Sequence, residues 1–221
     1  DGDGWLDLVV GNETKDGGPQ HPCQLFLSRR DGTFVDVAAE TGARNEAADF
    51  QFPGADLMRV PDTSTYVAYG ASIKGNKLPF TKVEFADGTF RRRNTIDGDA
   101  WDHVTFPTGY WGDRDSKLWT PAMFAHREDG RVVYYLFYSA AEPGAAPEPD
   151  RKHCLGYATS LSYAGGFVAN AEPLFCPEKG WAIDADVSRG QDGIWLTLRN
   201  GAWTEDGFTA LGAAKLDFRS P

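Results

Sequence analysis

Short segments rich in apolar, β-branched and aromatic residues recur along the chain and predict an all-β structure. Strands are expected at Leu6–Gly11, Gln24–Ser28, Tyr66–Ala71, Lys82–Phe85, Arg131–Ser139, Leu155–Ser160, Ile194–Arg199 and Ala213–Phe218. Turn dipeptides separate them: Asp31-Gly32, Asp87-Gly88, Asp129-Gly130, Asp192-Gly193 and Asp206-Gly207. Helical periodicity is almost absent, and the one helix-compatible stretch, Val35–Thr41, is short. This pattern favours a sandwich, barrel or propeller.

Charge and hydropathy exclude two kinds of partner. The chain has 221 residues, 41% of them apolar, which is enough for a sizeable core. Its net charge is −10, and the only basic run is Arg91–Arg93, so the sequence lacks the basic face that nucleic acid requires. No stretch of about 20 apolar residues could span a membrane as a helix. An acidic surface suits a soluble secreted protein or one that binds cations.

The first seven residues carry three carboxylates at close spacing. Asp1, Asp3 and Asp7 flank Trp5, and glycines between them allow a sharp bend. Ca²⁺ takes six to eight oxygen ligands at about 2.3–2.6 Å, and such loops supply them from side chains and one backbone carbonyl. The pattern predicts a Ca²⁺ loop, with an Asp-Gly-rich turn that binds nothing as the alternative.

The loop and the residues after it resemble an FG-GAP or VCBS repeat. That family reads Asp-x-Asp-x-Asp-Gly-x-x-Asp before a strand, and the match continues through the Asp31-Gly32 hairpin to about residue 43. The resemblance implies a partial repeat over residues 1–43 in which Asp1, Asp3, Asp7 and the Trp5 carbonyl bind Ca²⁺. It also implies that the chain begins inside the loop and that its parent carries further domains.

From Phe50 onward the sequence contains a different series of motifs. In chain order they are Phe52-Pro53-Gly54-Ala55-Asp56, Tyr66-Val67-Ala68-Tyr69-Gly70, Trp119-Thr120-Pro121-Ala122, Tyr134-Tyr135-Leu136-Phe137-Tyr138-Ser139, His153-Cys154-Leu155-Gly156-Tyr157-Ala158-Thr159-Ser160, Pro173-Leu174-Phe175-Cys176-Pro177 and Ala182-Ile183-Asp184. This order resembles the five-bladed β-propeller of glycoside hydrolase family 43. The resemblance implies that residues 44–221 form the N-terminal part of such a propeller, about three blades.

The resemblance also implies an inverting glycosidase site built from three acids. A base activates water, a protonated Glu protonates the leaving oxygen, and a further Asp orients that Glu and sets its pKa. Asp184 matches the orienting Asp. The base position holds Gly54, so the base is missing unless Asp56 replaces it, because residues i and i+2 of a strand share a face. Otherwise Asp56 is a surface or turn carboxylate, and the acid falls beyond Pro221.

The same motifs imply further roles for two tryptophans and two cysteines. Trp119 and Trp181 match segments at the pocket rim, where an indole can stack on a sugar, although core packing is the commoner role of Trp. Cys154 and Cys176 are expected to form a disulfide, which implies an oxidising, extracellular location. Cys23 would then be free or paired outside the chain.

Three functions remain open on these residues. The first is an inverting glycosidase for arabinose- or xylose-containing polysaccharide. The second is a relative that binds glycans without cleaving them, and the third is a structural or adhesive cell-surface protein. Gly54 and Ala122, which replace acids of the family pattern, favour the second and third functions, whereas Asp184 and the tryptophans favour the first and second.

Overall fold

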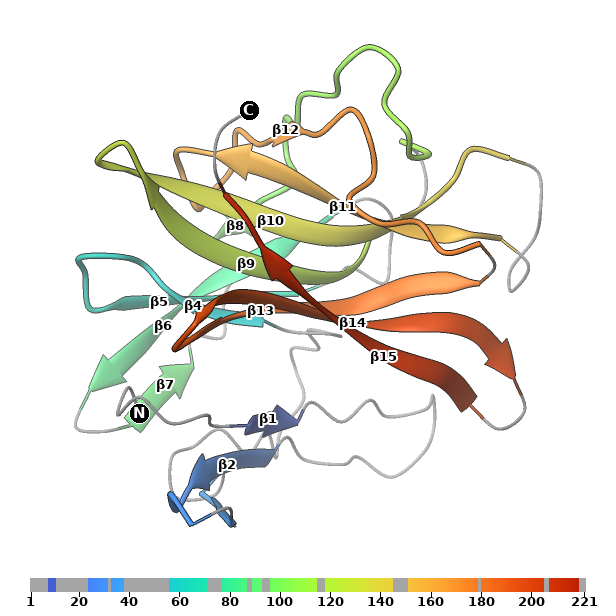
Figure 1. Cartoon of the computed structure of the whole chain (residues 1–221). Coiled ribbons are helices and arrows are strands. Elements are labelled where there is room, and N and C mark those ends of the chain that lie inside the picture. The colour runs from blue at the N-terminus through green and yellow to red at the C-terminus, as the bar shows by residue number, and fades with distance from the viewer. Residues whose placement is uncertain are drawn as a thin grey trace.

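All the regular structure in the described part of the chain is β (Figure 1). The computed structural model describes residues 8–10, 24–31, 33–37, 56–70, 77–86, 89–92, 96–114, 118–144, 151–178, 180–204 and 207–218. These residues form fifteen strands in three sheets. Within them, no helix is long and apolar enough to cross a membrane.

A small antiparallel sheet comes first in the chain. It contains β1 (Leu8–Val10), β2 (Gln24–Ser28) and β3 (Phe34–Asp36) in that order. The Asp31 carboxylate accepts hydrogen bonds from the backbone N–H and the hydroxyl of Thr33, which stabilises the predicted turn between β2 and β3. The helix considered for Val35–Thr41 is wrong where the structure describes it, because Val35 and Asp36 lie in β3.

The second sheet, here called unit A, follows as an antiparallel meander. Its strands are β4 (Asp56–Arg59), β5 (Thr65–Tyr69), β6 (Pro79–Ala86), β7 (Thr89–Arg92) and β8 (Gly98–Asp99). The strand order is β4-β5-β6-β7, and β8 also pairs with β6.

The third sheet consists of two meanders joined by one parallel bridge. Unit B contains β9 (Trp119–Glu128), β10 (Arg131–Ala141), β11 (His153–Ser160) and β12 (Val168–Ala169). Unit C contains β13 (Trp181–Gly190), β14 (Gly193–Thr204) and β15 (Gly207–Leu216). A bridge between His153 and Trp181 connects them. The predicted Asp129-Gly130 turn joins β9 to β10, and both residues have positive φ (47° and 79°), as a tight hairpin requires.

The first strands of the three units are neighbours in space. β9 contacts both β4 and β13, whereas β4 and β13 do not contact each other. The polar side chains at the beginnings of these three strands are therefore brought to the same region.

Two apolar seams hold the units together. The first seam, between units A and B, contains large buried side chains, including Tyr69, Leu78, Leu136, Tyr138 and Phe167. The second seam, between units B and C, has a buried core that includes three alanines, Ala122, Ala182 and Ala185. Small side chains let β9 and β13 approach each other closely at the place where the candidate site lies.

Candidate active site

Two of the three first strands contain a β-bulge near their beginnings. In β9 the register shifts between Trp119 and Ala122, and in β13 it shifts between Ile183 and Asp186. Each bulge contains a residue other than glycine in the left-handed region, namely Thr120 at φ 47° and Asp184 at φ 54°. Such bulges redirect a side chain and are common beside functional sites.

Asp184 occupies the bulge of β13 and is held from two sides. Its backbone N–H donates to the Thr120 hydroxyl at 2.9 Å, so that the β9 bulge supports the β13 bulge. Its carboxylate accepts a hydrogen bond from Arg199 of β14 at 2.6 Å. Both side chains are accessible, with 32% of Asp184 and 39% of Arg199 exposed. The structure therefore presents an oriented carboxylate and a guanidinium at the surface.

Asp56 lies in a different environment at the beginning of β4. Its carboxylate accepts the backbone N–H of Met123 in β9 at 2.6 Å and so ties unit A to unit B. Part of the residue stays exposed, but its carboxyl group is desolvated. The Asp56 pKa is raised to about 7, mainly by burial and in part by the nearby negative charge of Asp186, whereas the hydrogen bond from Met123 lowers it. This carboxylate bridges two strands.

Asp186 is a second carboxylate of β13 that the sequence argument did not consider. It lies two residues after Asp184, is exposed as a whole residue, and has a carboxyl pKa raised mainly by desolvation. The structure thus brings Asp56 within electrostatic reach of Asp186.

Trp119 and Trp181 pack against each other and against His153. The two indoles meet edge to face at 5.3 Å, and the His153 ring stacks on Trp119 at 4.4 Å. The Trp181 Nε1–H donates to the Arg151 carbonyl at 2.9 Å. Both tryptophans are half-buried as whole residues, and they lie at or beside the bulges. His153 itself is buried, with 2% of the residue exposed.

A disulfide between Cys154 and Cys176 fixes the edge of unit B, with Cα atoms 4.4 Å apart. Glu142 lies beside it, and its carboxylate oxygen is 3.2 Å from the Cys176 sulfur and 3.2 Å from Lys152 Nζ. Because Cys154 directly follows His153, the disulfide anchors the strand beneath the tryptophan pair.

Several predicted residues lie outside the described part of the chain. These are Asp1, Asp3, Trp5 and Asp7 of the Ca²⁺ loop, the Gly54 position, and the boundary proposed near residue 43. Their roles stay predictions.

Sequence reasoning missed two residues that hold Asp184, namely Thr120 and Arg199. Thr120 was visible as the residue after Trp119 in the Trp-Thr-Pro motif, but nothing in the sequence indicates that its hydroxyl faces β13. Arg199 lies at the end of a predicted strand, and it pairs with Ile183, next to Asp184, only because the register shifts in the bulge between Ile183 and Asp186.

Comparison with solved structures identifies the fold. The chain is similar to a family 43 endo-arabinanase from Bacillus licheniformis, with a TM-score of 0.54 and 15% identity over 99% of this chain and 71% of that one. It is also similar to an α-L-arabinofuranosidase from Lactobacillus brevis, with a TM-score of 0.51 and 13% identity over 75% of this chain and 49% of that one. No protein-family model and no curated protein matches the sequence.

The chain is shorter than the enzymes that share its fold. It spans 49% of the Lactobacillus brevis enzyme, and it spans 43% of a family 43 β-xylosidase/α-arabinofuranosidase from a compost microbial metagenome (TM-score 0.42, 22% identity, 67% of this chain). The fold is that of the family 43 glycoside hydrolase propellers, and the chain contains part of it.

Proposed function

We propose that this chain is a carbohydrate-binding module with a family 43-like propeller fold that binds arabinan- or xylan-type glycans and does not hydrolyse them. The contrast between two carboxylates carries the proposal. Asp184 is accessible and paired with Arg199, whereas Asp56, the residue that the sequence pattern offers as a displaced base, is desolvated and accepts a hydrogen bond from the Met123 N–H.

The argument against turnover follows from the chemistry of inverting hydrolysis. One carboxylate must deprotonate a water while an acid protonates the leaving oxygen, with the two groups about 6.5–9.5 Å apart. The position that the family pattern gives to the base is Gly54, which has no side chain, and the desolvated Asp56 carboxylate is committed to the β9 backbone. Loss of a general base typically costs about 10²–10⁴-fold in rate, so we expect turnover near background.

The argument for binding rests on what stays accessible. The Asp184 carboxylate accepts hydrogen bonds and the Arg199 guanidinium donates them, and charge-assisted bonds to sugar hydroxyls are among the stronger polar contacts. The half-buried edges of Trp119 and Trp181 supply apolar surface nearby. This combination of a few fixed polar groups with aromatic surface is typical of small-molecule sites.

We extend the proposal to the rest of the chain. Residues 1–43 would form the FG-GAP-like repeat, with Ca²⁺ bound by Asp1, Asp3, Asp7 and the Trp5 carbonyl, and residues 44–221 the partial propeller. The Cys154–Cys176 disulfide supports an extracellular or cell-surface location, since disulfides persist in oxidising compartments. Calorimetric titration with CaCl₂ tests the loop: we expect uptake that Asp3→Asn weakens, and no uptake would refute it.

The test of the proposed function combines binding with turnover. The chain is titrated calorimetrically with arabino- and xylo-oligosaccharides and assayed on aryl α-L-arabinofuranoside and β-xyloside. We expect saturable binding that Asp184→Asn weakens, with no hydrolysis above background. Hydrolysis that Asp56→Ala abolishes would overturn the non-catalytic assignment, and absence of any glycan binding would overturn the proposal as a whole.

One observation favours a structural or adhesive role as the second candidate. The edge-to-face packing of Trp119 on Trp181 and the stacking of His153 on Trp119 use indole surface that sugar stacking would need. In that case Trp181→Ala would lower the melting temperature without changing affinity for any oligosaccharide. A glycan-binding role predicts a loss of affinity in the same variant.

A further inference from the structure

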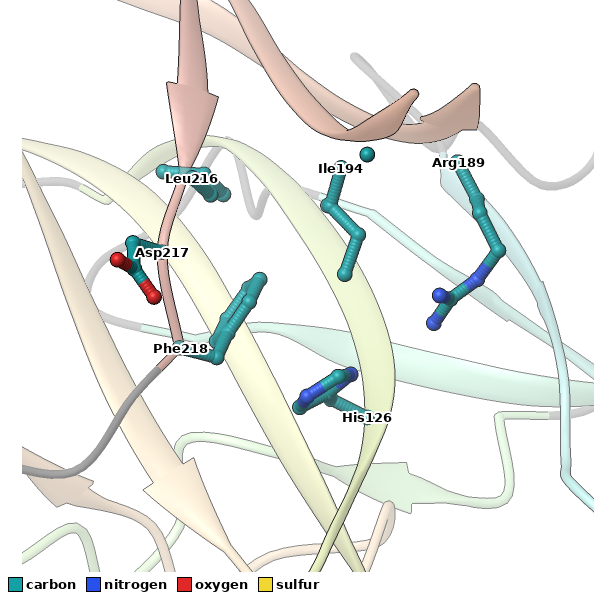
Figure 2. A pocket seen from close by; sticks show the side chains of 7 residues that line it. His126, Arg189, Ile194, Leu216, Asp217 and Phe218 are labelled. Atoms are coloured by element: carbon teal, nitrogen blue, oxygen red, sulfur yellow. The ribbon is translucent and has the colours of Figure 1, made fainter. Parts of the chain in front are cut away.

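A hollow lies at the opposite end of β13 from Asp184, on the second seam (Figure 2). Its volume is about 310 Å³, and its lining comes from the ends of β9 and β13, the beginning of β14 and the residues after β15. Asp184 and Arg189 are five positions apart in β13, roughly 16 Å at the usual strand rise. The hollow is therefore separate from the candidate active site.

The walls of the hollow are apolar. Ile194, Leu216 and Phe218 line it, and Phe218 also packs on the His126 ring at 4.7 Å. Figure 2 shows these side chains around a common space. Apolar and aromatic walls of this kind bind the C–H face of a small ligand.

The rim of the hollow carries the positive charge of Arg189. Arg189 lies over the Phe124 ring at 5.6 Å, and no described carboxylate pairs with it. His126 also lines the hollow, and its Nδ1 is a buried polar atom without a hydrogen-bond partner in the structure. The one acidic residue of the lining, Asp217, points its carboxylate away from Arg189 and His126 (Figure 2). The other nearby acids are engaged, since Glu128 accepts from the Tyr135 hydroxyl and Asp192 pairs with Lys215.

We infer that this hollow binds a single sugar acid, with the carboxylate of a uronate unit on Arg189 and its C–H face on Leu216 and Phe218. The planar guanidinium matches a carboxylate in a two-pronged geometry. The volume lies at the small end of the usual 300–1,000 Å³ range for ligand sites, which suits one pyranose rather than an oligosaccharide. On a chain with a net charge of −10, an arginine that pairs with no carboxylate among the described residues is the feature that selects for an anion.

The inference is independent of the proposed function, because the two sites share no residue. The test is an NMR or calorimetric titration of the 221-residue chain with galacturonate, glucuronate, galactose and acetate. We expect both uronates to bind. Galactose lacks the carboxylate and acetate lacks the sugar ring, so each should bind at least about tenfold more weakly.

The matched variants are Arg189→Gln and Arg127→Gln. Arg127 is also an arginine of this edge, but it pairs with Asp62 and does not line the hollow. Arg189→Gln should weaken uronate binding about tenfold or more, and Arg127→Gln should change it less than about twofold. No saturable uronate binding, equal binding of acetate, or equal losses in the two variants would each overturn the inference. Unchanged melting temperatures would show that both variants fold.

Discussion

The two seams join similar β-meanders with different side chains. The first seam buries large aromatic and aliphatic groups and contains a buried pair of tyrosine hydroxyls, Tyr110 and Tyr138, 3.0 Å apart. The second seam is built around Ala122, Ala182 and Ala185, and the bulges of Thr120 and Asp184 lie on it. The first seam has the larger set of buried apolar side chains, and the second allows a close approach of β9 and β13.

The two seams therefore differ in what their side chains favour: stability at the first, and close contact between strands at the second. Large side chains at a seam give the greatest apolar stabilisation, but they hold the strands apart. Small side chains bring the strands close enough for the Thr120 hydroxyl to accept a hydrogen bond from the Asp184 backbone, whereas the corresponding contact across the first seam uses the Asp56 carboxylate at the beginning of β4. A site that needs two strands in register is therefore expected on the alanine-rich seam.

The largest expected effect is the loss of a large side chain from the first seam. Leu136 is fully buried there, and we expect Leu136→Ala to lower the free energy of unfolding by about 4 kcal/mol, since burial is lost and a cavity remains. Leu198→Ala in the second seam, at 7% exposure, is the matched control and should cost about 2 kcal/mol. Urea denaturation of both variants measures this, and a larger loss at Leu198 would reverse the ranking of the seams.

The second effect concerns the disulfide beside the second seam. Cys154 and Cys176 are 22 residues apart, so by the chain-entropy account their bond stabilises the fold by roughly 3 kcal/mol. The Cys154→Ala/Cys176→Ala double variant should show this loss in urea denaturation. Reducing agent should destabilise the wild type and leave the variant unchanged. If reduction affects both equally, the effect lies elsewhere in the chain.

A smaller, pH-dependent effect is expected at Asp56, where β4 meets β9. Its pKa is about 7 in the folded chain and near 3.8 when unfolded, so folding binds a proton between these values. The stability that this group contributes is therefore fully present below about pH 4 and is lost as pH rises towards 7. Asp56→Asn keeps an oxygen for the Met123 N–H and removes the charge.

Asp56→Asn should therefore raise the free energy of unfolding at pH 8 by on the order of 1–2 kcal/mol, after allowance for partial exposure. At pH 4 it should leave the free energy of unfolding nearly unchanged. Melting curves at the two pH values measure the difference. Asp62→Asn, which removes an exposed charge of the same unit, is the control and should show no such dependence on pH. A variant that is destabilised at pH 8 would show that the ionised carboxylate is needed.

The first strands of the three units were harder to predict than the strands that directly follow them. The strands predicted around Gln24–Ser28, Arg131–Ser139 and Leu155–Ser160 are present, two of them slightly longer than expected. None of the predicted strands corresponds to β4, β9 or β13. β9 starts with Trp-Thr-Pro and contains a bulge, and the bulge interrupts the alternation of apolar and polar residues by which a strand is predicted.

The candidate site shows the same limit. Asp184 and Asp56 could be selected from sequence because the motif order pointed to them. The environments of these two residues could not be predicted. The hydrogen bond of Asp56 depends on Met123, 67 positions away, and the ion pair of Asp184 depends on the register of β14. The residue types were visible in the sequence, whereas the contacts between strands depend on the three-dimensional arrangement of the strands.

The smallest expected effect on stability is at Asp184, where the effect on binding should be largest. Its pair with Arg199 is about one-third exposed on each side, and such pairs contribute about 0–1 kcal/mol. Asn tolerates the left-handed backbone of this position, so Asp184→Asn should change the free energy of unfolding by less than about 1 kcal/mol. Asp184→Ala should cost about 1 kcal/mol more, because Ala is strained at φ 54°.

Both variants should weaken oligosaccharide binding about tenfold or more by removing the charged acceptor. Asp129→Asn, an exposed Asp with φ 47°, is the matched control and should leave both stability and affinity unchanged. Calorimetric titration with thermal melting separates the two readouts. If Asp184→Asn lowers the free energy of unfolding by several kcal/mol and leaves affinity intact, Asp184 stabilises the second seam as Asp56 stabilises the first. The proposed difference in function between the two carboxylates would then be wrong.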